Sequence, residues 1–416
     1  MTSDRIILKP GEELRILKGH PWVYDNEIET TITTKPDGIL LPGTVADVES
    51  SNKKYLGRAF VNPHSKIRAR IFSRSKEGVD KGFFKRRFRE AINRRRLTYN
   101  LNIESARLIF GEADFLPGLV VDRYVGHEVG NEEQRASWLS VQFLTAAMDV
   151  RRDEIVEALI DVLSDDIGKP LGIMERSEAR VRELEGLPIQ SNVIYGSIPE
   201  EGIVIQENGL RFFVNISGGQ KTGHFLDQKR NRRLAASFAQ NRRCLDVCCN
   251  TGGFAINAAS SGASSVIALD ISTQALDAVK YNASLNGVSN KITVLEADIF
   301  DSLRLMEKKG ETFDWIVLDP PAFAKTKKSL TGALRGYKEI NLRAMNLLEK
   351  NGILITCSCS AALREEEFKS LITDAAFDAG KRLQRLSFTY QAEDHPILEG
   401  FDESLYLKCG IYRILT

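Results

Sequence analysis

A cysteine and an aspartate in the C-terminal half lie in sequences that suit covalent chemistry. Asp319 begins the run DPPAF at 319–323, whose two prolines remove backbone donors and stiffen the turn. Cys359 lies in the run TCSCS at 356–360. A thiolate that adds to C6 of a cytosine makes C5 nucleophilic, and a fixed carboxylate suits binding N3 or the exocyclic amine of the ring. These residues predict alkylation at C5, with Cys359 as nucleophile and Asp319 binding the base.

The other cysteines need no chemical role. All six lie in the C-terminal half, at Cys244, Cys248, Cys249, Cys357, Cys359 and Cys409. Their spacing forms neither a disulfide framework nor the paired CxxC pattern of a zinc site, so we expect no bound metal and a reducing, cytoplasmic location. A cysteine at a strand end usually packs as a small apolar side chain, which is what we expect of Cys248, Cys249 and Cys357.

Three further acidic residues end strand-like segments in the same half. They are Asp246, Asp270 and Asp298, and the first is followed by Asn250 and the pair Gly252-Gly253. A single such acid is more commonly a helix N-cap or a surface charge. Three in succession favour a nucleotide-like cofactor, with Asp270 on the ribose hydroxyls and Asp298 on the adenine amino group. The pattern resembles the S-adenosylmethionine-binding motifs of class I methyltransferases, and the absence of GxGxxG disfavours a nicotinamide dehydrogenase.

A glycine-rich turn at 218–223 leads into the start of a helix. Just after it, Phe225 is placed to cover the adenine or the sulfonium of the cofactor, and Asp227 and Gln228 to supply polar contacts. Asp319 and the adjacent Pro320 complete the predicted cofactor-binding set.

Alternating apolar strands and amphipathic helices position these residues. The expected strands are 244–249, 265–270, 292–296, 313–318 and 352–358. The expected helices are 254–261, 273–286, 302–309, 337–348 and 364–380. This alternation predicts an α/β fold with a parallel sheet covered by helices on both faces. Residues 383–388 and 406–414 are expected to complete the sheet as an antiparallel hairpin.

Three domains are expected in the 416 residues. Residues 1–75 predict a small β-rich module, residues 76–200 a central α+β domain, and residues 201–416 a Rossmann-like domain. The segment GHPWVY at 19–24 resembles the start of a PUA-type RNA-binding domain. The 43% apolar and 27% charged content is ordinary for a globular protein, and no apolar run reaches the roughly 18 residues needed to span a bilayer, so no membrane partner is expected.

The net charge of +1 conceals a basic stretch. Residues 53–96 contain sixteen lysines and arginines against three acidic residues. Such an excess is typical of a surface that binds a polyanion, because lysine and arginine supply most non-specific affinity for phosphates. For residues 85–96 alone, a solvated helix face is an equally good interpretation.

Taken together, the motifs resemble the bacterial large ribosomal subunit RNA methyltransferase I family. They are KTGxFLDQ at 221–228, NTGGF at 250–254, DPPAF, RGYKEIN at 335–341 and SCS at 358–360. The resemblance covers essentially the whole chain and implies methylation of cytosine C5 in 23S ribosomal RNA, with a PUA domain ahead of the methyltransferase domain. A homodimer would enlarge the basic surface. As in that family, Ala322 stands where two-cysteine RNA cytosine methyltransferases carry a second cysteine, so the base that removes the C5 proton is unassigned. The chain departs from the family pattern at two positions: Cys357 adds a second thiol beside the expected nucleophile, and His224 stands where a tyrosine is expected.

Two other functions stay open at this point. DPPAF also resembles the [DN]PP[FYW] loop of amino methyltransferases, which need no thiol. A catalytically silent RNA-binding assembly factor would keep the fold but lose cofactor binding. The effect of removing Cys359, and binding of the cofactor, distinguish these hypotheses.

Overall fold

The computed structural model describes residues 4–36, 38–218, 224–323 and 330–415. Its contacts divide the chain into two compact units. The first unit contains residues 1–206, 214–226 and 393–404, and the second contains residues 207–213, 227–392 and 405–416. Each unit has its own sheet structure and its own hydrophobic core.

The second unit is built on a seven-stranded sheet. In spatial order its strands are β16 (Ile292–Glu296), β15 (Ser265–Asp270), β14 (Arg243–Val247), β17 (Phe313–Leu318), β18 (Leu348–Ser358), β20 (Lys408–Ile414) and β19 (Leu383–Thr389). The first five are parallel, whereas β20 pairs antiparallel with both β18 and β19. The strand order reverses between β14 and β17, and ligands of such sheets bind beyond the carboxyl ends of the strands at this switch point.

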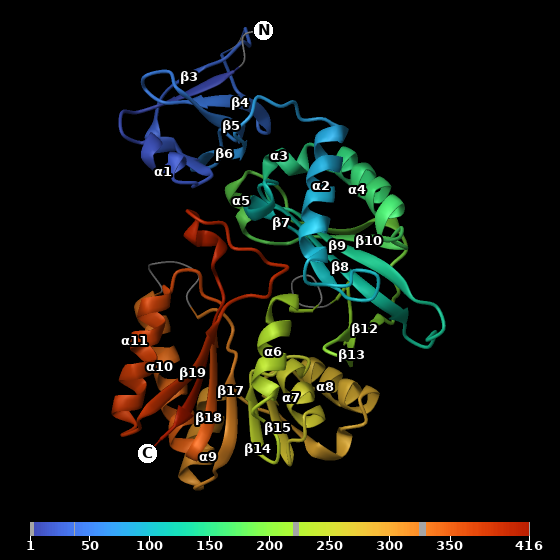
Figure 1. Ribbon diagram of the computed structural model, residues 1–416, viewed down its shortest axis with the longest axis vertical. Coiled ribbons are helices and arrows are strands. Elements are labelled where there is room, and N and C mark those ends of the chain that lie inside the picture. The colour runs from blue at the N-terminus through green and yellow to red at the C-terminus, as the bar shows by residue number, and fades with distance from the viewer. Residues whose placement is uncertain (1–3, 37, 219–223, 324–329, 416) are drawn as a thin grey trace. The chain divides into compact units, whose positions relative to one another are not determined.

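Helices cover both faces of this sheet (Figure 1). One layer contains α6 (Lys229–Ala236), α7 (Gly253–Ser260) and α8 (Thr273–Leu285), and the other contains α9 (Ile299–Lys308), α10 (Leu330–Leu347) and α11 (Glu365–Asp378). The central strands are mostly apolar, as expected where helices cover both faces of a sheet, and Trp315, Ile316, Val317 and Leu318 in β17 are fully inaccessible. The outer strands β16 and β19 are largely half-buried or exposed. The expected parallel α/β sheet with a terminal antiparallel hairpin is confirmed.

Two helices begin earlier than the sequence predicts. α9 begins at Ile299 rather than at 302, because the Asp298 side chain caps its first turn. α10 begins at Leu330 rather than at Tyr337. The first part of α10 contains Gly332 and Gly336, and their low helix propensity is the reason that the sequence does not predict a helix there. Gly336 allows close packing, because an added Cβ would lie 3.3 Å from the Phe323 ring.

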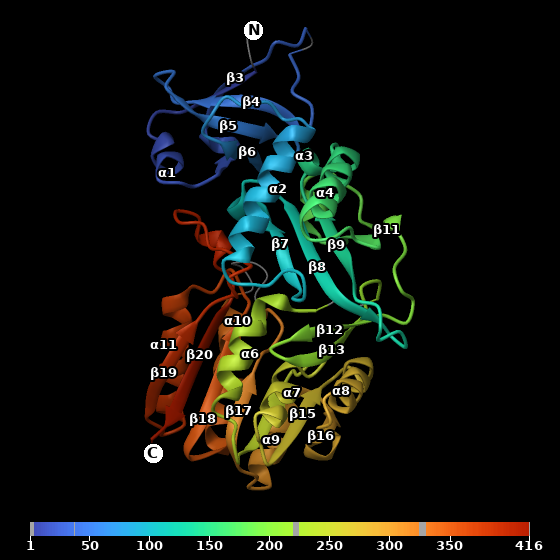
Figure 2. The ribbon, with the colours of Figure 1, turned by 45° about the vertical axis from the view of Figure 1, so that its right-hand side comes forward.

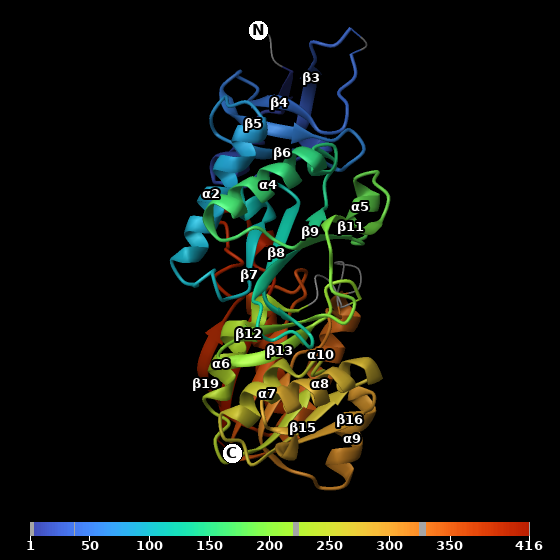
Figure 3. The same ribbon diagram turned by 90° about the vertical axis from the view of Figure 1, so that its right-hand side faces the viewer.

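The first unit begins with a six-stranded sheet. Its order is β2 (Trp22–Tyr24), β6 (Ile67–Ser73), β5 (Tyr55–Val61), β4 (Thr44–Glu49), β1 (Arg5–Leu8) and β3 (Ile28–Ile32), with the short helix α1 (Glu13–Leu17) beside it. Figure 3 shows β4, β5 and β6 side by side. Small and branched side chains, including Ile6, Val23 and Val48, form its core. The expected β-rich module is confirmed, although the sequence did not predict α1, β2 or β3.

A second sheet follows in the same unit. Its strands in order are β11 (Gln190–Gly196), β10 (Gly172–Ser177), β9 (Ala136–Phe143), β8 (Leu119–Glu128) and β12 (Ile203–Glu207), and β7 (Ala106–Phe110) also pairs with β8. Helices α2 (Lys81–Arg96) and α4 (Arg152–Asp166) lie side by side (Figure 2), accompanied by α3 (Ala146–Asp149) and α5 (Val181–Leu184). Phe83, Phe84 and Phe88 of α2 are fully buried in the core of this sheet, as their helical spacing predicts.

A few short elements complete the description. Strand β13 (Leu210–Val214) follows β12, and 3-10 helices occupy Asp25–Glu27, Gly111–Asp114, Leu226–Gln228, Ser289–Lys291 and Asp402–Ser404. Across the described residues, none of the helices combines the length and the apolar character required to cross a bilayer.

Candidate active site

The predicted acidic residues converge at the carboxyl ends of the central strands. Burial raises the pKa of the Cys248 thiol, which directly follows β14, and the charges of Asp270, Asp319, Asp246 and Asp298 raise it further. All four carboxylates therefore act on one loop. Cys248 itself is a poor candidate for a nucleophile, because both its burial and its acidic surroundings disfavour the thiolate.

Asp246 is a buried acid whose charge the fold disfavours. Its side chain is fully buried; Oδ2 accepts a hydrogen bond from the Ala255 backbone N–H at 2.8 Å, and Oδ1 has no partner. Burial raises the pKa of Asp246 to about 8, and the charges of Asp319 and Asp270 add to this, while the Ala255 N–H and Arg232 oppose it. A buried carboxylate with one unsatisfied oxygen is costly, and such groups cluster at binding and catalytic sites.

The loop after β14 has an unusual backbone. Cys248 and Asn250, with φ of 59° and 49°, occupy the left-handed region that non-glycine residues avoid, and Gly252 has φ of 82°. Asp270 braces this loop, because its Oδ2 accepts from the Asn250 N–H at 2.9 Å and its Oδ1 from the Ser272 N–H at 3.0 Å. Strain held in place by a neighbouring strand end is typical of a ligand-binding loop.

Gly253 allows a close approach of another side chain. A Cβ at this position would lie 2.5 Å from Nε of Arg232, whose guanidinium donates to Glu207 at 2.7 Å. Any larger residue would displace a buried ion pair that lies against the first turn of α7.

Asp298 is the N-cap of α9. Its Oδ1 accepts from the backbone N–H groups of Phe300 and Asp301 at 2.8 and 3.2 Å, and the residue is exposed. Asp298 therefore has the common structural role of an acid after a strand, which is to cap the following helix. A contact between Asp298 and an adenine amino group stays a prediction.

A buried chain of amides orients Asp319. Gln228 donates from Nε2 to Asp319 Oδ1 at 3.0 Å and accepts at Oε1 from Asn231 Nδ2 at 2.7 Å. Asn231 in turn accepts from the Thr389 hydroxyl at 2.8 Å. Because each amide is fixed by its neighbour, the carboxylate at the end of β17 has a defined orientation. From the sequence, only a general polar contact is expected of Gln228.

The remaining upstream candidates lie in different settings. Asp227 is buried and accepts at Oδ2 from the Tyr406 hydroxyl at 2.6 Å. Phe225 is half-buried and belongs to the first unit, so its predicted contact with the cofactor stays a prediction. His224 is buried there, and its backbone N–H donates to the Tyr124 hydroxyl at 3.2 Å. The predicted glycine-rich turn falls largely on residues 219–223, outside the described residues.

Cys359 differs from the other cysteines in its exposure and surroundings. All six cysteines lie in the described residues and none forms a disulfide; Cys359 and Cys248 are partly exposed, whereas the other four are buried. Burial raises the pKa of Cys244 to about 12, and Cys357 has a pKa well above its usual value because of its contact with the Cys409 thiol and its burial. Cys359 follows directly after β18, the strand next to β17 and Asp319.

A buried tyrosine joins the two chain segments that carry Asp319 and Cys359. The Tyr337 hydroxyl, fully buried on α10, accepts from the Ser358 hydroxyl at 3.1 Å and is 3.0 Å from the Ser360 hydroxyl. Its ring lies against that of Phe323, with centroids 4.7 Å apart. Both neighbours of Cys359 are thus tied to one phenol. The sequence offered a signal in the RGYKEIN run, to which no role was assigned.

Comparisons with known proteins decide the family. A family model described as S-adenosylmethionine-dependent methyltransferase matches residues 129–413, and a PUA-like domain model matches residues 6–74. The ribosomal RNA large subunit methyltransferase I of Tolumonas auensis is 38% identical over 417 residues, which cover 99% of this chain and 100% of that protein. The chain belongs to the ribosomal RNA large subunit methyltransferase I family.

Other members and solved structures agree. The ribosomal RNA large subunit methyltransferase I of Aeromonas hydrophila is 40% identical over 415 residues, or 99% of each chain. A methyltransferase from Streptococcus mutans has the same fold, with a TM-score of 0.80 at 20% identity over 98% of this chain and 99% of its own. A solved methyltransferase complexed with S-adenosylhomocysteine has a TM-score of 0.81 at 21% identity over the same shares. The expected family, fold class and cofactor, S-adenosylmethionine, are confirmed.

The residues of this methyltransferase fit such a cofactor. Asp246 offers a buried oxygen without a partner, and Gly252 and Gly253 leave the loop without side chains where α7 begins. The α7 N-terminus and the strained loop present backbone N–H groups at the strand ends. A charged, hydroxyl-rich ligand would satisfy polar groups that the protein alone leaves unpaired.

The GHPWVY segment of the PUA-like domain has a structural role within the first unit. His20 is buried beside Phe401, with ring centroids 5.2 Å apart. Trp22 lies 4.7 Å from the Phe401 ring, donates its indole N–H to Glu112 at 2.7 Å and carries the Arg70 guanidinium 5.1 Å above it. The segment therefore anchors the 393–404 connection and the central sheet to the small N-terminal sheet.

The basic stretch is neutralised along α2. Every lysine and arginine of this helix forms an ion pair: Lys81, Lys85, Arg86, Arg87, Arg89, Arg94, Arg95 and Arg96. Many of the partners, including Asp161, Asp165 and Asp166, come from the neighbouring helix α4. The local excess of charge in the sequence is therefore largely compensated in the fold.

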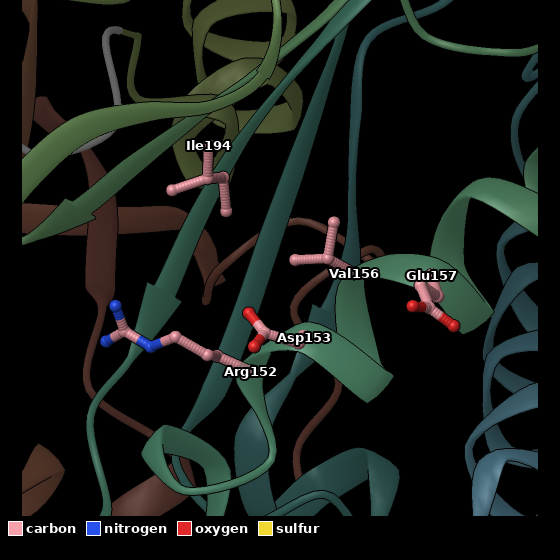
Figure 4. Close-up of a pocket in the computed structure, with 5 residues that line it drawn as sticks. All are labelled: Arg152, Asp153, Val156, Glu157 and Ile194. Atoms are coloured by element: carbon pink, nitrogen blue, oxygen red, sulfur yellow. The ribbon is translucent and has the colours of Figure 1, made fainter.

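A pocket of about 280 Å³ lies within the first unit. Figure 4 shows Arg152, Asp153, Val156 and Glu157 of α4 and Ile194 of β11 around it. Arg152 is already bonded to Asp149 and Gln190, at 2.6 and 2.7 Å. Nothing in this lining is a nucleophile or an unpaired buried acid, so the strand ends of the second unit are the better candidate for an active site.

Proposed function

We propose that this methyltransferase forms 5-methylcytosine in 23S ribosomal RNA, with Cys359 as the nucleophile. The observation that carries the proposal is the setting of Cys359: a partly exposed thiol, held between two serines bonded to one tyrosine, at the end of the strand beside Asp319. The names of the full-length relatives support a large-subunit ribosomal RNA as substrate.

The cofactor site uses the loop after β14 and the adjoining strand ends. Asp246, Asn250, Gly252, Gly253 and Asp270 form its centre, and the remaining candidates are Phe225, Asp227, Gln228, Asp298, Asp319 and Pro320. When bound there, S-adenosylmethionine supplies the electrophilic methyl group that cytosine C5 takes up.

The chain's own residues prepare the pyrimidine. The Cys359 thiolate adds to C6, and the electron pair of the C5–C6 double bond moves onto C5, where the new carbon bond forms. Asp319, held by Gln228, accepts a hydrogen bond from the exocyclic amine or, when protonated, donates one to N3. The C5 proton then leaves to a base, the double bond re-forms, and the C6–sulfur bond breaks to return the thiolate.

Exposed lysines of the PUA-like domain are the best candidates for RNA contact. Lys53 and Lys54 lie in the turn between β4 and β5, and Lys66 directly precedes β6. All three are exposed, and within the described part of the chain none forms an ion pair. We infer that phosphates are contacted here rather than along α2, whose cations already have partners.

Transfer of a labelled methyl group to unmodified bacterial 23S ribosomal RNA, followed by nucleoside analysis, tests the proposal. Wild type and the control Cys357→Ala are expected to yield 5-methylcytidine, and Cys359→Ala to yield none while still binding S-adenosylhomocysteine. An N-methylated product, or full activity of Cys359→Ala, would favour exocyclic-amine methylation by the DPPAF loop. Absence of both transfer and cofactor binding in the wild type would favour a non-catalytic assembly factor.

A further inference from the structure

A buried lysine lies directly beside the turn that follows Cys359. Lys408 is the first residue of β20 and stands opposite Ser358 in the antiparallel pairing with β18. Its side chain is 1% exposed. Its Nζ donates to the carbonyl oxygens of Ser360 and Leu363, both at 2.8 Å.

These two carbonyls define the turn at the end of β18. The Ser360 oxygen also accepts from the Leu363 backbone N–H at 3.1 Å, which closes the turn, and the ammonium of Lys408 bridges its two ends. Tyr337 fixes the same segment from α10 through Ser358 and Ser360. Cys359 is thus held from both sides, by a phenol on one element and by an ammonium on another.

A buried lysine is an expensive way to satisfy two carbonyls. Burial lowers the pKa of Lys408 to about 8, and the Cys359 thiolate and Glu365 are the charges that oppose this fall. A neutral donor would bond the same oxygens without the cost of desolvating a charge. The electrostatic interaction between the Lys408 ammonium and the Cys359 thiolate is a function that a neutral donor could not perform.

We propose that Lys408 is a positioning residue for Cys359. The ammonium group of Lys408 fixes the turn after the cysteine and places a positive charge beside the thiol. The proposal rests on the role of Cys359 given above. The lysine favours the thiolate, which is the form that adds to C6, and keeps the sulfur in place. It neither touches the substrate nor takes part in a bond that is made or broken.

Other ionisable groups face the same turn. Glu365 on α11 is the nearest acid to oppose the lysine, and it accepts hydrogen bonds from the Tyr390 hydroxyl and from Lys369. Among the described residues, Tyr337 on α10, Cys409 on β20 and Asp319 after β17 are further ionisable groups near this turn. Two of the groups named here are cations: Lys408 bonds the turn itself, whereas Lys369 is bonded to Glu365.

The reactivity of Cys359 toward iodoacetamide tests the proposal without relying on methyl transfer. Alkylation at Cys359 is followed by fragment-level mass spectrometry across a pH series in the full-length wild type, Lys408→Met, Lys408→Gln and Lys408→Arg. Arg413→Met is the matched control, because it removes an exposed cation from the same strand. Thermal melting and S-adenosylhomocysteine binding verify the fold of each variant.

We expect the midpoint of the alkylation profile to rise by about one pH unit in Lys408→Met and Lys408→Gln, so that the rate at pH 7 falls about tenfold. Lys408→Arg and Arg413→Met are expected to keep the wild-type profile. If Lys408→Gln keeps that profile too, the charge has no effect on the thiol and the proposal is wrong. If Lys408→Met does not fold, Lys408→Gln decides alone.

Methyl transfer separates this result from the proposed function. Lys408→Gln is expected to lower kcat about tenfold at pH 7 with little change in the KM for S-adenosylmethionine, and to recover activity as the pH rises. If Cys359→Ala remains active while Lys408→Gln still shifts the alkylation profile, the lysine tunes a thiol that is not the nucleophile. In that case the proposed function fails and the electrostatic effect of Lys408 stands.

Discussion

Replacing Asp246 with asparagine should stabilise the protein and weaken its binding of the cofactor. The carboxyl is fully buried, and its pKa is raised to about 8, chiefly by burial. A carboxyl whose pKa is higher in the folded than in the unfolded state binds its proton more tightly when folded. The folded state is therefore penalised increasingly as the pH rises from about 4 to about 8, and the penalty is constant above that.

The size of the penalty follows from the two pKa values. With an unfolded-state value of about 3.9 and 1.36 kcal/mol per pKa unit, it is about 5 kcal/mol at pH 8 and about 1.5 kcal/mol at pH 5. Asp246→Asn removes this titration but keeps the shape of the side chain. The free energy of unfolding of Asp246→Asn should thus exceed that of wild type by about 3.5 kcal/mol more at pH 8 than at pH 5.

Urea unfolding of the cofactor-free protein at both pH values measures this difference. Asp114→Asn is the opposite control, because ion pairs with Arg95 and Arg94 overcome its burial and lower the pKa of Asp114. Its carboxylate stabilises the fold above the unfolded-state pKa and loses this effect as the pH falls through the folded-state pKa, so the substitution should cost more at pH 8 than at low pH. In contrast, Asp246→Asn should weaken S-adenosylhomocysteine binding at least about tenfold, because an oxygen that the protein leaves unpaired is lost. A pH-independent stability difference, or unchanged affinity, would refute this reasoning.

Further predictions follow from the tyrosine and the exposed lysines. Tyr337→Phe removes the hydroxyl shared by Ser358 and Ser360 and should lower kcat at least about tenfold while leaving the KM for S-adenosylmethionine nearly unchanged; steady-state kinetics measure both. Equal loss in both parameters would argue for a general folding defect. Lys54→Ala and Lys66→Ala should each reduce the slope of log affinity against log salt for RNA by about one, as measured by filter binding. Arg89 of α2 already pairs with Asp165, so Arg89→Ala should change that slope little. A reduction equal to that of the lysine variants would show that α2 contacts the RNA.

The sequence predicts the second unit well because buried parallel strands have a strong local signal. The expected bounds of β15, β16 and β17 coincide with those in the structure. Short, half-exposed elements of the first unit, such as α1 and β11, have no such signal. The acids at the strand ends are predictable for the same reason as the strands, because Asp246 and Asp270 interrupt or end apolar runs and Asp298 comes two residues after β16.

What the sequence could not predict depends on partners that are distant in the chain. Half of the cations of α2, namely Lys81, Lys85, Arg89 and Arg96, pair with acids on α4 about 70 residues later, so a local window of the sequence does not show that they are neutralised. His20 and Trp22 pack against Phe401, which makes the GHPWVY segment structural. The sequence contains a signal for Lys408 that we did not use. A lysine within the apolar segment from Tyr406 to Ile411 indicates a buried charge, and Lys408 is indeed buried.

Trapping of a covalent enzyme–RNA complex tests the central claim most directly. Fluorine at C5 of cytosine cannot leave as a proton, so once C5 is alkylated the bond between Cys359 and C6 persists. Ribosomal RNA transcribed with 5-fluorocytidine, incubated with S-adenosylmethionine and the wild-type protein, is expected to give a complex that survives denaturing electrophoresis. Cys357→Ala should give the same complex and Cys359→Ala none. A complex with Cys359→Ala, or none with a wild type that methylates unmodified RNA, would contradict the account.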